Sequence, residues 1–170
     1  MTSPPYGAAQ KYIRSTSLES GWLGFTTDKG TIDLERASVG REHLTKDERL
    51  ATIASLGNGR LTAILNEIAE DHPVRASIYT NYFLDMERVL RNAALPAVNC
   101  KRLVVICGTN TVRGKHIETH EVLSEIALTK GFKRTLSLRD AIKGRTLLTT
   151  RNSDGTPAPA EFIEVFERDI

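Results

Sequence analysis

The sequence predicts an α/β domain, and three observations support this prediction. Apolar residues recur at helical spacing within residues 46–96, which indicates a helical segment. Residues 103–107 form a short, continuously apolar run that ends at a glycine, as expected for a strand buried on both faces in a parallel sheet. Beyond residue 79 the order is helix, strand, helix, strand, loop and strand, which is part of an α/β sandwich ending in a hairpin.

Residues 46–71 are predicted to form two helices. The second has the clearer apolar face, with side chains spaced by three and four residues: Leu61, Ile64, Leu65 and Ile68. Gly57 and Gly59 separate it from an earlier apolar turn, because glycine weakens a helix interior. A third helix is predicted to end before Pro96, and its apolar face is Tyr79, Phe83, Met86 and Leu90.

The predicted sheet combines the run at 103–107 with a strand around Leu136 and Leu138 and a last strand at 162–166. A helix follows the first of these strands. Thr119 is expected to cap its start, and Lys130-Gly131 to end it. Residues 146–149 look strand-like, whereas the segments 26–45 and 152–157 are predicted to be loops.

Composition favours a soluble, cytoplasmic protein of one domain. The 170 residues carry a net charge of +2, which permits contact with nucleic acid without requiring it. Two cysteines give no disulfide framework, and no leader or long apolar run indicates a membrane partner. No metal site is expected: His116, Glu118 and His120 lack the companion cysteines of a zinc deaminase and are predicted to lie in a solvated loop that runs into a helix.

The chain begins with a stiff segment, Ser3-Pro4-Pro5-Tyr6. Proline fixes φ and lacks an N–H donor, so this segment is excluded from a helix interior or a central strand. It is predicted to be a rigid, extended corner that holds Ser3 and Tyr6 in fixed directions. A frayed, proline-rich start is the plain alternative.

This corner and the segments behind it resemble amino-directed DNA methyltransferases. Residues 3–6 look most like the catalytic motif of the cytosine-N4 group, and the adenine-N6 enzymes share the pattern. Further similar segments follow in the family's order, at residues 12–14, 22–24, 37–40, 83–86, 102–108, 111–114 and 162–166. The ordered set spans nearly the whole chain and is more specific than any one segment.

The resemblance implies a Rossmann-like class I methyltransferase fold, of which this chain is the C-terminal half. Residues 1–170 would be one partial catalytic domain, with the catalytic turn and a loop at 1–45, a helical segment at 46–96 and the sheet with a helix at 97–170. The family binds S-adenosylmethionine on a glycine-rich turn that this chain lacks, since residues 108–114 carry Asn110 where a second glycine belongs. The expected partners are therefore DNA and either a cofactor-binding half or a second copy of the chain.

The resemblance also assigns roles to residues. Ser3 and the carbonyl of Pro4 would accept hydrogens from an exocyclic amino group, and Pro5 would keep that carbonyl aimed. Tyr6 would stack on a base that has left the helix. Thr2 and Ser3 would border the cofactor. The residues expected to contact the substrate DNA, besides Tyr6, are Lys11, Arg14, Arg113 and Lys115.

Three alternatives stay open from the sequence. One is a related enzyme that acts on RNA or on a protein amide, because such enzymes also use an X-Pro-Pro-Tyr turn. The second is a non-catalytic half that binds nucleic acid or regulates, and the third is a remnant that folds poorly alone. Methylation at ring carbon C5 is not favoured, because neither Cys100 nor Cys107 follows a proline.

Overall fold

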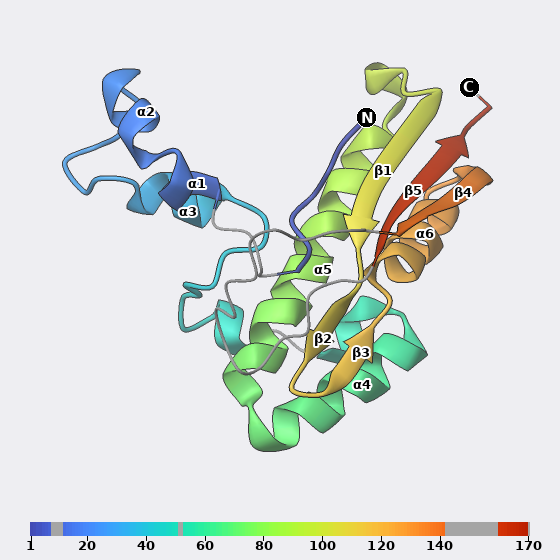
Figure 1. The fold of residues 1–170 in the computed structure, drawn as a ribbon, viewed down its shortest axis with the longest axis horizontal. Helices are drawn as coiled ribbons and strands as arrows, with labels where there is room; N and C mark the ends of the chain where they lie inside the picture. The colour runs from blue at the N-terminus through green and yellow to red at the C-terminus, as the bar shows by residue number, and fades with distance from the viewer. Residues whose placement is uncertain (8–11, 51–52, 142–159, 170) are drawn as a thin grey trace.

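The computed structural model describes residues 1–7, 12–50, 53–141 and 160–169 and has a mixed α/β architecture (Figure 1). This mixed architecture confirms the predicted α/β class. Its main sheet has three strands in the order β1-β5-β4, and both pairings are antiparallel. The strands are β1 (Arg102–Gly108), β4 (Lys133–Ala141) and β5 (Ala160–Glu167). The last two therefore pair as the predicted hairpin.

The prediction that the apolar run is buried on both faces in a parallel sheet was wrong. Burial alternates along β1: Leu103, Val105 and Cys107 are buried, whereas Val104 and Ile106 are half-buried. The strand pairs in antiparallel fashion with β5 over its whole length. Its parallel neighbour is a single residue, Thr2, whose N–H donates to Val104 O over 2.8 Å and whose carbonyl accepts from Ile106 N–H over 3.0 Å.

The predicted helical segment is confirmed in its second and third helices, whereas short 3₁₀ turns stand where the first helix was predicted. Two 3₁₀ turns, η1 (Glu48–Leu50) and η2 (Ile53–Leu56), come before α4 (Gly59–Asp71), and α5 (Pro73–Ala93) follows at once. The side chain of Asn58 accepts from Leu61 N–H at 2.8 Å, which explains why α4 begins directly after the glycine pair. The helix α5 starts earlier than predicted because proline is favourable in a first helical turn. It ends at Ala93, before the 3₁₀ turn η3 (Pro96–Val98).

The helix α6 (Thr119–Thr129) lies where the sequence predicts it, but its predicted cap was wrong. The N-cap residue is Glu118, and the Thr119 hydroxyl is buried without a hydrogen-bond partner in the described structure. The predicted end is correct. Gly131 adopts φ of +86° and its N–H donates to Leu128 O, the geometry that favours glycine after a helix.

Several short elements were not predicted. The segment 12–37 forms three short helices, α1 (Tyr12–Ser15), α2 (Ser17–Trp22) and α3 (Ile32–Ala37), the last within the predicted loop. Figure 1 shows them projecting away from the sheet. The loop after β1 is a small hairpin of β2 (Asn110–Val112) and β3 (Lys115–Ile117). The strand-like residues 146–149 and the loop 152–157 lie outside the described residues.

The core lies on one face of the sheet. Buried side chains of α4, α5 and α6 pack there with the inward residues of β1 and with Phe166 of β5. In Figure 1 the helices α5 and α6 lie behind the sheet. The opposite face is also apolar, because the pairing places two rows across it: Val104, Val165 and Leu136, then Ile106, Ile163 and Leu138. Leu136 and Leu138 are 46% and 47% exposed, so this face is incompletely covered.

Candidate active site

The diproline corner leaves the sheet at the carboxyl end of β1. Thr2 runs parallel to β1, so the chain after it points toward Gly108, the last residue of that strand. Pro4 and Pro5 are buried, whereas Ser3 is exposed and Tyr6 is half-buried. The plain alternative of a frayed start therefore does not describe this segment. The corner thus lies at the end of the sheet where β1 ends and its antiparallel partner β5 begins.

Two glycines allow other segments to pack against the corner. Gly7 has φ of +64°, and an added Cβ would lie 2.5 Å from Cε1 of Tyr79 and 2.9 Å from Nδ2 of Asn110. Gly40 has φ of +78°, and its added Cβ would lie 2.6 Å from Gly7 O and 2.9 Å from Cγ of Pro5. The diproline corner, the loop at Gly40 and the residues just after β1 thus meet here.

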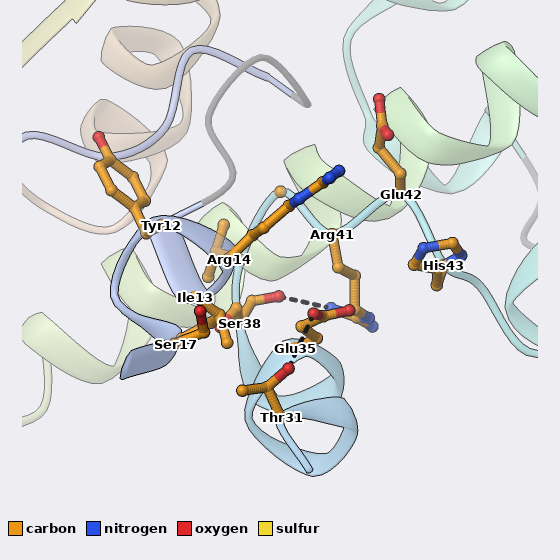
Figure 2. A pocket seen from close by; sticks show the side chains of 12 residues that line it. Tyr12, Ile13, Arg14, Ser17, Thr31, Glu35, Ser38, Arg41, Glu42 and His43 are labelled. Carbon is orange, nitrogen blue, oxygen red and sulfur yellow. Dashed lines mark hydrogen bonds between the residues drawn. The ribbon is translucent and has the colours of Figure 1, made fainter. Parts of the chain in front are cut away.

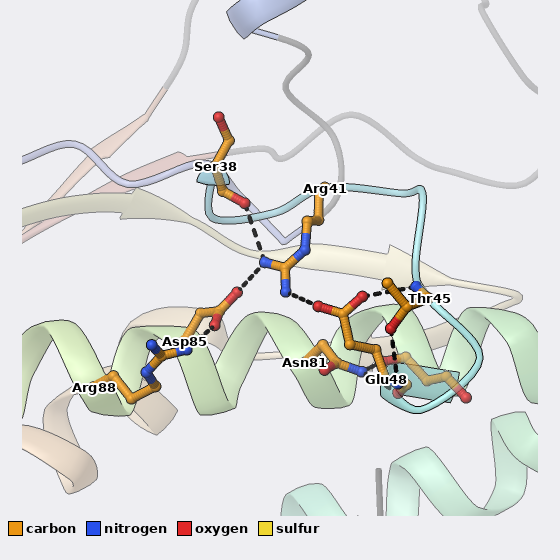
Figure 3. A network of polar contacts seen from close by, with 8 residues as sticks. Ser38, Arg41, Thr45, Glu48, Asn81, Asp85 and Arg88 are labelled. Carbon is orange, nitrogen blue, oxygen red and sulfur yellow. Dashed lines mark hydrogen bonds and ion pairs between the residues drawn. The ribbon is translucent and has the colours of Figure 1, made fainter. Parts of the chain in front are cut away.

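The segment that carries Gly40 is tied to α5 by Arg41 (Figure 3). The Arg41 guanidinium donates to Asp85 Oδ2 at 2.5 Å, to a carboxylate oxygen of Glu48 and to Ser38 O at 3.2 Å. Burial works against the charge on Arg41, but the two carboxylates outweigh it and raise the Arg41 pKa, while the Glu48 pKa is lowered chiefly by Arg41. Asp85 belongs to the motif-like segment 83–86, so the ion pair joins two of these segments.

The ring of Tyr6 is held at its hydroxyl. The Tyr6 O–H donates to Oε1 of Glu161 at 2.6 Å, although the two residues are 155 positions apart. Glu161 lies opposite Gly108 in the β1–β5 register, so the hydroxyl is held at the same end of the sheet as the corner. Burial raises the Tyr6 pKa and the hydrogen bond to Glu161 raises it further, whereas the Ser3 side chain lowers it slightly. The phenol therefore stays protonated at neutral pH.

A cavity of about 410 Å³ lies beside the corner (Figure 2). Its lining comes from α1, α3 and the loop after α3, and it includes Arg14, Gly40 and His43. The cavity meets the corner through Gly40, which packs on Pro5, while Ser3–Tyr6 are not among its lining residues. Its lining combines charged and polar side chains such as Arg14 and Glu35 with apolar surface from residues such as Ile13 and Val39.

Of the predicted substrate-contacting cations, the three that the structure describes come from two different parts of the fold. Arg14 lines the cavity just described, and Lys11 lies outside the described residues. Arg113 and Lys115 belong to the β2–β3 hairpin, where the Lys115 ammonium forms an ion pair with Glu67 of α4. Arg113 is exposed and adopts φ of +50°. Among the three described residues, only Arg14 lines the cavity.

The prediction of a solvated loop was only partly correct, because His116 is solvent-exposed but belongs to a strand, and His120 is buried in α6. His116 is exposed on β3, and Glu118 forms an ion pair with Arg60 at 2.7 Å. His120 is 6% exposed and stacks on Phe162 with ring centroids 3.6 Å apart. Within the described residues, no group of three or more His, Cys, Asp or Glu side chains is placed to hold a metal ion.

Burial raises the Cys107 pKa to about 12, which keeps that thiol protonated.

The described residues do not fit a complete site for S-adenosylmethionine. Residues 108–114, the segment nearest to a glycine-rich turn, form part of the β2–β3 hairpin and precede no helix directly. The predicted cofactor residues Thr2 and Ser3 are exposed, with the Thr2 backbone already bonded to β1. These two residues could border a cofactor held mainly by other parts of an enzyme.

The site also contains residues that sequence reasoning missed, namely Glu161, Asn110 and Arg41.

Searches against protein-family models, curated proteins and solved structures gave no match for this chain. None of the helices in the described ranges combines the length and apolar character needed to cross a membrane. The function is therefore inferred from the geometry of the corner.

Proposed function

We propose that this chain is the catalytic half of an S-adenosylmethionine-dependent DNA methyltransferase that modifies an exocyclic amino group of cytosine (N4) or adenine (N6). One observation carries the proposal: the stiff Ser3–Tyr6 corner is ordered at the carboxyl end of β1, with Ser3 exposed and the Tyr6 ring fixed by Glu161. The order of motif-like segments agrees with a Rossmann-like methyltransferase fold. This resemblance supports the proposal.

Each residue of the corner has a chemical task in this proposal. Ser3 Oγ and the Pro4 carbonyl accept the two amino hydrogens, which draws the nitrogen toward tetrahedral geometry and frees its lone pair for attack. Pro5 restricts the backbone so that the Pro4 carbonyl keeps its direction. Tyr6 offers a ring face to the flipped base, worth about 1–3 kcal/mol in comparable sites. S-adenosylmethionine would supply the electrophilic methyl group.

The apolar face of the sheet is the proposed contact for the cofactor-binding half, whether that half is joined to this chain or separate. The two rows that end at Leu136 and Leu138 are incompletely covered. Thr2 directs both backbone groups toward β1, so Met1 and Ser3 direct theirs to the other side, where a strand of the cofactor-binding half would pair. Covering this face and edge would bury the apolar rows and place a cofactor next to Thr2 and Ser3.

Reconstitution with a cofactor-binding half tests the proposal. We expect methyl transfer to duplex DNA, with N4-methylcytosine or N6-methyladenine identified by mass spectrometry of the nucleosides. The same assay with RNA and with protein substrates addresses the related enzymes that use a similar turn. Labelling of RNA or protein without labelling of DNA would contradict the choice of substrate. DNA binding without any methyl transfer would favour the non-catalytic alternative instead.

The chain alone gives a second test. Calorimetry with S-adenosylmethionine should show little or no binding, because the described residues form no complete cofactor site. Tight binding by the isolated chain would contradict the proposed division of the active site. DNA binding is expected to be weak in the same preparation, because the net charge is only +2.

A further inference from the structure

The cavity of about 410 Å³ beside the corner has two hydrogen-bond donors on its wall that are not yet used. They are the Arg14 guanidinium of α1 and the His43 imidazole of the loop after α3. In the part of the chain that the structure describes, neither side chain has an ion-pair or hydrogen-bond partner. Figure 2 shows Arg14 extending from α1 toward the loop that carries His43. An arginine without a carboxylate partner presents a planar set of donors to an anion.

The other charged side chains on this wall already have partners. Arg41 is committed to the network of Figure 3, and Glu42 forms an ion pair with α5 at 3.2 Å. Glu35 accepts from the Thr31 hydroxyl at 3.2 Å through one carboxylate oxygen, which leaves its other oxygen for a further donor. Arg14 is therefore the arginine through which the described wall can bind an anionic group of a ligand.

The remaining wall restricts the rest of that ligand. Ile13 and Val39 add apolar surface, and Ser17 adds an exposed hydroxyl. The Glu35 carboxylate lines the same space and would repel a second anionic group, but it can accept from a hydroxyl or an amino group. The volume lies within the range of about 300–1,000 Å³ that small-molecule sites occupy. The cavity thus fits a molecule with one anionic end and an uncharged, partly apolar body that carries donors.

We propose that this cavity is a nucleotide-binding site. Arg14 and His43 hold the phosphate, the sugar and base lie against Ile13 and Val39, and the second Glu35 oxygen accepts from a sugar hydroxyl or a base amino group. A free mononucleotide and one unit of a nucleic-acid strand share this chemistry. The inference goes beyond methyl transfer and does not require it.

The position of the cavity gives a bound nucleotide a defined neighbour. Gly40 belongs to the cavity wall, and a Cβ on it would lie 2.9 Å from Cγ of Pro5. The site therefore adjoins the diproline corner without including it. A strand that places one nucleotide in the cavity would bring an adjacent nucleotide to the corner.

Calorimetry with the isolated chain tests the ligand class. We expect adenosine 5′-monophosphate (AMP) to bind at least tenfold more tightly than adenosine, which lacks the phosphate, and than inorganic phosphate, which lacks the body. Citrate should also bind at least tenfold more weakly, because Glu35 repels its additional carboxylates. No binding of AMP, or binding of citrate as tight as that of AMP, would overturn the inference.

Arg14→Gln tests the phosphate contact. We expect it to weaken AMP binding about tenfold or more while adenosine binding stays the same. Arg36→Gln is the matched control, because Arg36 lies on α3 with its side chain 61% exposed, pairs with Asp33 and is not part of the cavity wall. Equal losses in the two variants would show that AMP responds only to the net charge of the chain, and would overturn the assignment of Arg14.

Filling the cavity is a second test that does not depend on charge. Ser17→Phe places a ring in the cavity and should abolish AMP binding, whereas Ser15→Phe, outside the cavity wall, should not. Circular dichroism checks that both variants are folded. Unchanged AMP binding in a folded Ser17→Phe chain would place the nucleotide elsewhere and overturn the inference.

Competition identifies the source of the nucleotide. If a short single-stranded oligodeoxynucleotide displaces AMP and loses affinity in Arg14→Gln, the site takes a unit of a nucleic-acid strand. If AMP binds and the oligonucleotide does not displace it, the site takes a free nucleotide; both results support the nucleotide site. Failure of methyl transfer in the reconstituted enzyme leaves these binding results unaffected, and failure of AMP and oligonucleotide binding overturns the site while leaving the proposed role of the corner intact.

Discussion

Arg41 and Asp85 form an ion pair in which both side chains are nearly buried, at 12% and 13% exposure, and the pair fastens the segment behind the diproline corner to α5. Arg41→Ala leaves the Asp85 carboxylate without its main partner. We expect a loss of about 2 kcal/mol or more in the free energy of unfolding, measured by urea denaturation. Arg88 also pairs with Asp85 but is 69% exposed, so Arg88→Ala should cost less than about 0.5 kcal/mol. Equal losses in the two variants would contradict this account.

The same network predicts acid sensitivity. The folded Glu48 pKa is depressed, chiefly by the hydrogen bond from Arg41, so the folded state binds fewer protons there than the unfolded state does. The stabilisation is present above the unfolded pKa of about 4.3 and is lost as pH falls toward the lower folded pKa. Urea unfolding of the wild type and Glu48→Gln should converge at acid pH. A stability difference that is independent of pH would contradict the assignment.

Gly7 and Gly40 should not tolerate a side chain. Both have positive φ, and a Cβ would lie 2.5 Å from Tyr79 and 2.6 Å from Gly7 O, respectively. Gly7→Ala and Gly40→Ala should each lower stability by about 2 kcal/mol or more, because strain and overlap add. Gly24 is the matched control: its φ is +71°, but nothing lies near its Cβ position. Gly24→Ala should show only the backbone cost, about 1 kcal/mol. Circular dichroism on heating can measure all three.

His120 should make stability depend on pH in a second window. Burial lowers the folded His120 pKa, although the carboxylates of Glu121, Glu164 and Glu118 oppose this and Arg134 adds to it. The fold favours the neutral ring, so stability should fall as pH drops below the unfolded value of about 6.5. His120→Phe keeps a ring on Phe162 and should remove this part of the pH dependence. An imidazole resonance of His120 that titrates above pH 6.5 would refute the prediction.

The incompletely covered sheet face should be where the cofactor-binding half docks. Leu138→Lys places a charge in the middle of that face and should weaken association with that half about tenfold or more, as measured by calorimetry. Leu128 offers a matched control, because it is equally exposed, at 48% against 47%, but lies on α6. Leu128→Lys should leave the association unchanged. An equal effect of both variants would place the contact elsewhere.

Local sequence signals predicted much of the fold because they act over short distances. The spacing of Leu61 and Leu65 and the side-chain cap at Asn58 define α4 without reference to the rest of the chain. Gly131 ends α6 for a similarly local reason. The short helices in 12–37 escaped prediction because they bury almost nothing and have no apolar period of their own.

Tertiary pairing explains the remaining differences. The apolar run in β1 looks the same in sequence whether its neighbours are parallel or antiparallel, so its pairing with β5 could not be read from it. Glu161 and Tyr6 are joined across nearly the whole chain, and no spacing rule reaches that far. The diproline corner was predictable because proline acts on its own backbone. The contacts that hold the corner in place, such as the one between Tyr6 and Glu161, could not be predicted from the sequence.

The most direct measurement is the single-turnover rate of methyl transfer to duplex DNA by the reconstituted enzyme, compared between the wild type and Ser3→Ala. We predict a loss of about 10²–10³ in rate, the scale of removing one group that stabilises a transition state. Ser15→Ala is the control, because its hydroxyl is exposed and bonds only locally to Tyr12 O, and it should keep the wild-type rate. A Ser3→Ala enzyme as fast as the wild type would contradict the claim that this corner orients the reacting amino group.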